Sequence, residues 1–152
     1  MAVTYAAEVA NTLDSSVLPK QMADGRKQGG RVRVYEATIE YDGQASGDEI
    51  ILAQIPAGSK FLYGVLTASA TAGGTATIAI GESTLNSGTP DPDLLRSAAT
   101  FTAADTPTMF GRSTAVEAAA STVDKTISAV VGAASLPDSA NSLVVQLYYA
   151  NG

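Results

Sequence analysis

Residues 31–41 alternate so strictly between two sets of side chains that an extended strand is the conformation that separates them. Successive side chains of a strand point to opposite faces, whereas the 3.6-residue period of a helix would mix the two sets. One predicted face carries Arg33, Tyr35, Ala37, Ile39 and Tyr41, and the other carries Val32, Val34, Glu36, Thr38 and Glu40. We expect Tyr35, Ile39 and Tyr41 to face a core.

Similar patterns recur in short segments that are separated by turn residues. Pro56-Ala57-Gly58 predicts a turn, because proline fixes φ at its second position and glycine suits its end. Gly73-Gly74 between two apolar runs predicts a hairpin. We expect further strands over residues 49–55, 60–71, 75–80, 125–133 and 143–149, and a turn over residues 137–142. The pattern predicts an all-β protein, a jelly-roll-like β-sandwich over residues 31–152.

The middle of the chain is less regular. Asp91-Pro92-Asp93 is typical of a helix start, with aspartate as the cap and proline at the first helical position, so we expect one short helix over residues 94–99. Residues 102–111 are irregular or a short strand. Residues 114–117 match a capping box, which favours a helix, but the surrounding serines and threonines favour a strand, and we prefer the strand.

Residues 1–30 have a different composition, in which small and polar residues surround scattered apolar positions. We predict an extended N-terminal arm that becomes ordered against a partner; the alternative is a disordered terminus. A disordered, solvated terminus would not require apolar residues at these positions, so their presence favours the interpretation as a partner-binding arm. The predicted partner-binding residues are Val3, Tyr5, Leu13, Lys20, Arg26, Lys27, Arg31 and Arg33.

Charge is unevenly distributed along the chain. Residues 20–33 hold five basic residues and one acidic residue, whereas residues 34–152 hold 12 acidic and 4 basic residues, a net charge of −8. The acidic part would repel nucleic acid, and the basic segment lacks interleaved aromatic residues. We therefore expect no direct nucleic-acid binding, and expect the basic segment to dock on an acidic protein surface.

The sequence offers no set of residues suited to catalysis or metal binding. It contains no cysteine and no histidine, which excludes a Ser-His-Asp triad and zinc sites built on those residues. Glu36 and Glu40 lie four residues apart on one strand face, about 13 Å, too far for paired carboxylate chemistry. Asp48-Glu49 and Asp91-Pro92-Asp93 lack the spacing of a calcium loop. We predict that the protein is not an enzyme and has no cofactor or metal.

The apolar content is dominated by small residues, with 27 alanines, 3 phenylalanines and no tryptophan. Small side chains bury little area each, so self-association would add stability, and we expect a homo-oligomer. No apolar run reaches the roughly 18 residues of a membrane span, and the first residues do not resemble a signal peptide. We expect no membrane contact and synthesis in a bacterial host cytoplasm.

Five segments together resemble a known family. Residues 46–58 end in Ile-Pro-Ala-Gly, and residues 60–65 form a second strand. A glycine-centred turn at 72–75, a weakly helical segment at 92–99 and a final strand ending in Tyr148-Tyr149 follow. This order resembles the decoration (cement) proteins of tailed bacteriophages, β-sandwich or jelly-roll proteins on HK97-type shells.

The resemblance implies a structural virion protein on the capsid exterior that bridges subunits of the major capsid protein, as a dimer or trimer, without catalytic residues. One alternative is another virion part, such as a head fibre base or a tail component. A second alternative is a carbohydrate-binding or cell-surface module. Such modules usually expose aromatic residues, and this chain has 6 tyrosines, 3 phenylalanines and no tryptophan.

Overall fold

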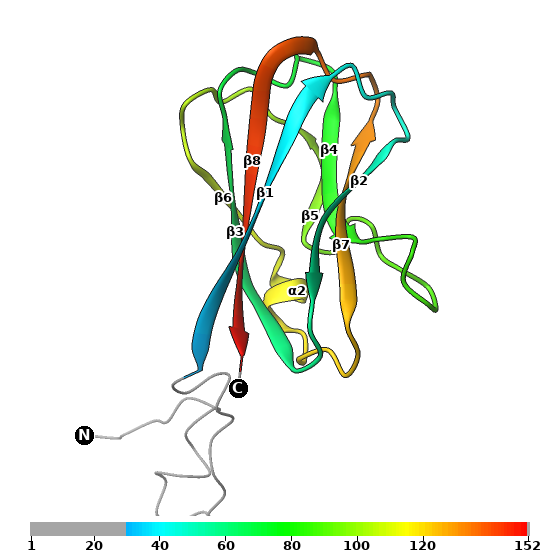
Figure 1. Cartoon of the computed structure of the whole chain (residues 1–152), viewed down its shortest axis with the longest axis vertical. Coiled ribbons are helices and arrows are strands. Elements are labelled where there is room, and N and C mark those ends of the chain that lie inside the picture. The colour runs from blue at the N-terminus through cyan, green and yellow to red at the C-terminus, as the bar shows by residue number, and fades with distance from the viewer. Residues whose placement is uncertain (1–29, 152) are drawn as a thin grey trace, which may run out of the picture.

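The computed structural model describes residues 30–151, which form two four-stranded antiparallel sheets packed face to face (Figure 1). Residues 1–29 and 152 lie outside the described residues, so the division into an arm (1–30) and a sandwich domain (31–152) stays a prediction. The elements are β1 (Arg31–Asp42), β2 (Glu49–Ile55), β3 (Ser59–Ala68), β4 (Thr77–Glu82), β5 (Arg96–Thr100), β6 (Thr108–Phe110), α2 (Ser113–Glu117), β7 (Lys125–Gly132) and β8 (Asp138–Asn151).

The strand order is that of a jelly roll. One sheet runs β1-β8-β3-β6 and the other runs β2-β7-β4-β5. β1 pairs with β8, β2 with β7, β3 with β6 and β4 with β5. In addition β8 pairs with β3, and β7 pairs with β4, which joins these pairs into two sheets. The predicted all-β, jelly-roll-like sandwich is confirmed.

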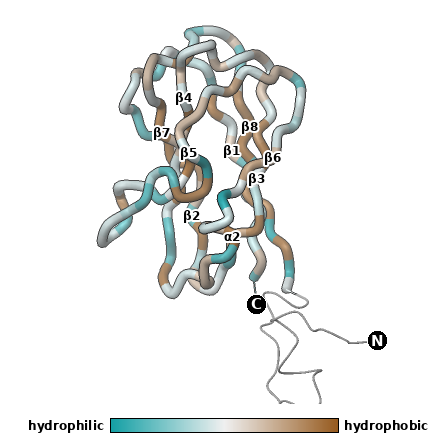
Figure 2. The backbone as a smooth tube through the Cα atoms, turned by 180° about the vertical axis from the view of Figure 1, so that it is seen from behind, coloured by the Kyte–Doolittle hydropathy of each residue, from teal (hydrophilic) through white to brown (hydrophobic). Residues whose placement is uncertain are grey.

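The core lies between the two sheets and follows the predicted alternation. On β8, Leu143, Val145 and Leu147 are at most 1% exposed, and they face the inward side chains of β7 and β4 across the sandwich. Ile39 and Tyr41 of β1 are buried as expected, and the Tyr41 hydroxyl donates a hydrogen bond of 3.0 Å to the Ala70 carbonyl. Figure 2 shows apolar residues mostly along the strands, whereas the loop that projects between β4 and β5 is largely polar.

The predicted hairpin at Gly73-Gly74 is wrong. β3 and β4 belong to different sheets, so the connection crosses from one sheet to the other. Two alanines explain the crossing: Ala72 and Ala76 are at most 1% exposed, and the Ala72 amide donates to the Phe101 carbonyl at 3.0 Å. The segment is held inside the sandwich edge and does not return beside β3.

The predicted helix over residues 94–99 is also wrong. The chain makes a turn at Asp91, where the Asp93 amide donates to the Asp91 carboxylate at 3.3 Å, and then enters β5 beside β4. The Leu95 amide donates to the Ile80 carbonyl at 2.9 Å, so a neighbouring strand edge takes up the hydrogen bonds that a helix would need. A local helix signal is weak compared with this tertiary pairing.

The one helix among residues 30–151, α2, lies where we had preferred a strand. Its amides at Ala115 and Val116 both donate to the Arg112 carbonyl at 3.0 Å, and Ala115 is buried against the core. The cap position is Arg112, without a side-chain cap, so the capping-box match at 114–117 indicated a helix but placed its cap two residues too late. The predicted turn over residues 137–142 is likewise replaced by the first part of β8.

Candidate interaction surface

The outer face of the β1-β8-β3-β6 sheet carries apolar side chains where a solvated sheet would be polar. The strand register places Val34, Tyr148 and Tyr63 in one row across three strands. The neighbouring row runs from Gln146 to Val65 and Met109. We call Val32, Val34, Tyr63, Val65, Met109 and Tyr148 the tyrosine patch.

The patch is ordered and partly exposed. The rings of Tyr63 and Tyr148 stack with centroids 4.4 Å apart and planes 16° from parallel. The Tyr148 hydroxyl donates to Gln146 Oε1 at 3.3 Å, and Gln146 Nε2 donates to Glu36 Oε2 at 2.7 Å, which ties the row to β1. Val32, Val34 and Met109 are 57%, 50% and 67% exposed. A contiguous exposed apolar group rimmed by polar residues is typical of an interaction site.

Two of the eight predicted partner-binding residues lie in the described part of the chain. Arg31 and Arg33 begin β1, opposite Asn151 and Tyr149, and both are exposed. They alternate with Val32 and Val34, so their side chains start from the face of β1 opposite the tyrosine patch. The other six residues, Val3, Tyr5, Leu13, Lys20, Arg26 and Lys27, lie outside the described residues.

Sequence reasoning did not find the patch. The available signal was the pair Val32 and Val34 on the face of β1 that otherwise carries Glu36, Thr38 and Glu40. Tyr63 and Tyr148 gave no separate signal, because their meeting depends on the pairing of β3 with β8.

The carboxylates considered for calcium are engaged in structural contacts. Glu49 accepts hydrogen bonds from the Thr84 amide at 2.9 Å and the Ser128 hydroxyl at 2.7 Å. Hydrogen bonding, chiefly from the Thr84 side chain, lowers the pKa of Glu49 to about 2. Asp93 pairs with Arg112 at 3.3 Å. Within residues 30–151 no cluster of three or more metal-ligating side chains occurs, and no helix there is long and apolar enough to cross a membrane.

Comparison with solved structures finds chains of similar fold. No family model and no curated protein matches the sequence. A chain in the capsid of Ralstonia phage GP4 is similar at a TM-score of 0.66, with 22% identity over 81% of this chain and 86% of that one. A chain of the cyanophage Pam1 capsid asymmetric unit has a TM-score of 0.65, with 17% identity over 89% of this chain and 95% of that one. This is a fold found in phage capsids.

A third similar chain comes from the acid-stable capsid of Helicobacter pylori bacteriophage KHP30, with a TM-score of 0.55 and 14% identity. The match covers 78% of this chain and 86% of that one. In all three cases the alignment spans most of both chains, so the matched capsid chains are similar in length to this protein. At these identities the likeness establishes the fold.

Proposed function

We propose that the protein is a phage capsid decoration protein that sits on the capsid exterior and stabilises the shell by bridging major capsid protein subunits. The observation that carries the proposal is the jelly-roll likeness to chains of similar length in three phage capsids. Glu49 and Asp93 are engaged in contacts within the fold, which supports a structural rather than a catalytic role for the protein.

The charge distribution suggests how the protein docks. In this proposal the basic residues of 20–33 contact the shell, and the net charge of −8 on residues 34–152 suits a body that faces away from packaged DNA. In this proposal the arm, with Val3, Tyr5, Leu13, Lys20, Arg26 and Lys27, binds the major capsid protein, and Arg31 and Arg33 extend that contact to the start of the sandwich.

The tyrosine patch is proposed to bind a second copy of the chain. β1 supports this partner, because Val32 and Val34 stand exposed on the strand face that further along carries Glu36, Thr38 and Glu40, so an apolar area has a polar border. In a symmetric contact each copy offers the same surface, so the valines and tyrosines of the two copies would be buried against one another.

Placing charge in the patch should weaken self-association. We expect Val34→Asp combined with Met109→Asp to raise the dissociation constant of the oligomer by about tenfold or more, because about 1.4 kcal/mol of lost apolar burial suffices for that change. Sedimentation velocity over a concentration series measures the effect. Leu85→Asp is the matched control, since Leu85 is 74% exposed on the loop between β4 and β5. Equal association of all three proteins would exclude the patch as the interface.

Capsid binding tests the proposed function directly. Purified protein mixed with phage heads that lack it should sediment with them, and binding should saturate at many copies in a fixed ratio to the major capsid protein. Quantitative gel bands of the pelleted particles give that ratio. A few copies per particle would favour a head fibre base or a tail component, and absence from the pellet together with glycan-array binding would favour a surface-binding module.

A further inference from the structure

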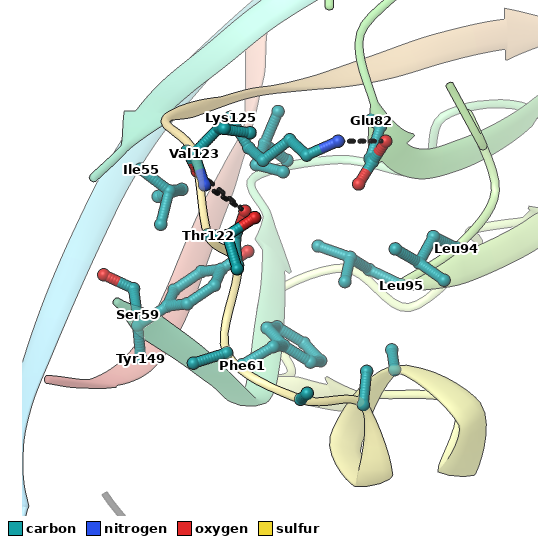
Figure 3. A pocket seen from close by; sticks show the side chains of 16 residues that line it. Ile55, Ser59, Phe61, Glu82, Leu94, Leu95, Thr122, Val123, Lys125 and Tyr149 are labelled. Atoms are coloured by element: carbon teal, nitrogen blue, oxygen red, sulfur yellow. Dashed lines mark hydrogen bonds and ion pairs between the residues drawn. The ribbon is translucent and has the colours of Figure 1, made fainter. Parts of the chain in front are cut away.

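A cavity of about 380 Å³ opens at the end of the sandwich where β1 begins and β8 ends (Figures 1 and 3). Its walls come from both sheets and are mostly apolar, with Ile55, Phe61, Leu95 and Ile127 facing inward. The segment from α2 to β7 forms the remaining side. Protein interiors are normally close-packed, and an unfilled space of this size between two sheets is large enough to bind a ligand group.

Small residues keep the cavity open. Ala115 of α2 and the consecutive residues Ala118, Ala119 and Ala120 line it with methyl groups only. Lys60 Nζ donates to the Ala118 carbonyl at 2.7 Å, and the Ser121 amide donates to the Ser59 carbonyl at 3.2 Å. These bonds fix the alanine segment to β3 as a wall.

Tyr149 is one of the polar residues of the cavity wall, which also includes Ser59 and the ion pair of Glu82 with Lys125 at 3.1 Å (Figure 3). Its side chain lines the cavity and is wedged between Tyr35 and Phe61, at centroid distances of 5.9 Å and 5.4 Å. The residue is 5% exposed, and among residues 30–151 no fully buried side-chain polar atom lacks a hydrogen-bond partner. Burial raises the pKa of Tyr149 above its ordinary value, so the phenol stays neutral and can donate a hydrogen bond. The hydroxyl can therefore donate a hydrogen bond to a group that enters the cavity.

The N-terminal segment joins the sandwich beside this cavity. Asn151 of β8 pairs with Arg31 on one side and with Ser59, which lines the cavity, on the other. Neighbouring strands lie about 4.8 Å apart, so the backbone of Arg31 is roughly 10 Å from that of Ser59. Residues 1–29 continue from this point, and an extended chain spans about 3.3 Å per residue. Their apolar side chains include Val3, Leu13, Val17, Leu18 and Met22.

We infer that the cavity binds an apolar side chain from residues 1–29 of the same chain, with a backbone carbonyl of that segment accepting a hydrogen bond from the Tyr149 hydroxyl. The short path from Arg31 gives the segment a high effective concentration at its own cavity. Such a contact would fasten the arm to the end of the sandwich. It concerns the free protein and holds whether or not the protein binds capsids.

Disulfide trapping in the full-length protein tests this contact. Because the sequence contains no natural cysteine, only the introduced pair can form a disulfide. Thr122→Cys places one thiol at an exposed position on the cavity wall. It is combined in turn with Val3→Cys, Leu13→Cys, Val17→Cys, Leu18→Cys or Met22→Cys. Ala140→Cys, exposed near the start of β8 at the opposite end of the sandwich, replaces Thr122→Cys as the control.

In dilute oxidising solution, we expect at least one arm position to form an intramolecular disulfide with Cys at 122 about tenfold faster than with Cys at 140. Non-reducing gels separate intramolecular from intermolecular products. Equal rates at both ends would overturn the inference, and so would products formed only between copies, which would assign the cavity to the arm of a neighbour.

Two substitutions show whether the arm enters the cavity. Ala119→Phe should fill it from its exposed wall and reduce trapping to the control rate, and Tyr149→Phe should slow trapping by removing only the hydroxyl. Thermal unfolding confirms that both variants fold. If both fold and trap at the unchanged rate, the segment does not occupy the cavity, and the inference fails.

Discussion

Removing residues 1–30 should leave a folded sandwich that no longer binds capsids. Among residues 30–151 the buried core lies between Ile39 and Ala150, and the truncation removes none of these core residues. It does remove Lys20, Arg26 and Lys27 together with the apolar positions of the arm. If the arm makes the main shell contact, we expect an affinity loss of about 100-fold or more, or roughly 3 kcal/mol. Co-sedimentation with phage heads measures it.

A charge-neutralised full-length chain separates the two contributions of the arm. Lys20→Gln, Arg26→Gln and Lys27→Gln together keep the length and the apolar side chains but remove three positive charges. We expect this variant to bind more weakly than the natural chain and to lose most of the salt dependence of binding. Normal capsid occupancy by the truncated protein would remove the arm from the docking mechanism. Circular dichroism shows whether the truncated protein keeps its β structure.

Gly81→Ala, which adds a single methyl group, should strongly destabilise the fold. A Cβ at this position on β4 would lie 2.3 Å from the Asp91 carbonyl oxygen and 2.7 Å from the Leu94 amide nitrogen. Both neighbours are backbone atoms, and the Glu82 amide donates to the same Asp91 carbonyl at 2.8 Å. Gly81→Ala must therefore push the 91–94 segment off β4. We expect about 3 kcal/mol of destabilisation, or a fall in Tm of roughly 10 °C.

Gly74→Ala is the matched control, because a Cβ there meets no atom within 4 Å and the backbone is not in a left-handed conformation. We expect a change between zero and about 1 kcal/mol of stabilisation, through the lower entropy of the unfolded chain. Urea unfolding of the two variants measures both effects. A similar loss of stability in both would show that the close packing of Gly81 is not the cause.

The strands and the fold class could be predicted because they depend on local pattern. The alternation in residues 31–41 and 143–149 assigns each side chain to a face before any partner strand is known, and β1 and β8 bury the expected residues. The turn at Pro56-Ala57-Gly58 likewise requires only the preferences of its own residues, and β2 ends and β3 begins on either side of it.

The errors occurred where a distant segment competes with a local preference. Gly73-Gly74 suggested a hairpin, but the burial of Ala72 and Ala76 carries the chain to the other sheet. Asp91-Pro92-Asp93 suggested a helix, but the edge of β4 takes the hydrogen bonds of the following residues. The partners in both cases are far along the chain, so no local pattern records them.

The sequence by itself determined that this is a β protein without cysteine or histidine, since periodicity and composition are properties of the chain alone. The tertiary structure decided the candidate sites among residues 30–151. Tyr63 and Tyr148 meet only because β3 pairs with β8, and the cavity at Tyr149 exists only where four alanines happen to face the open end of the sandwich. Surfaces and cavities depend on which distant residues become neighbours, and the pairing of strands that are far apart in the sequence determines those neighbours.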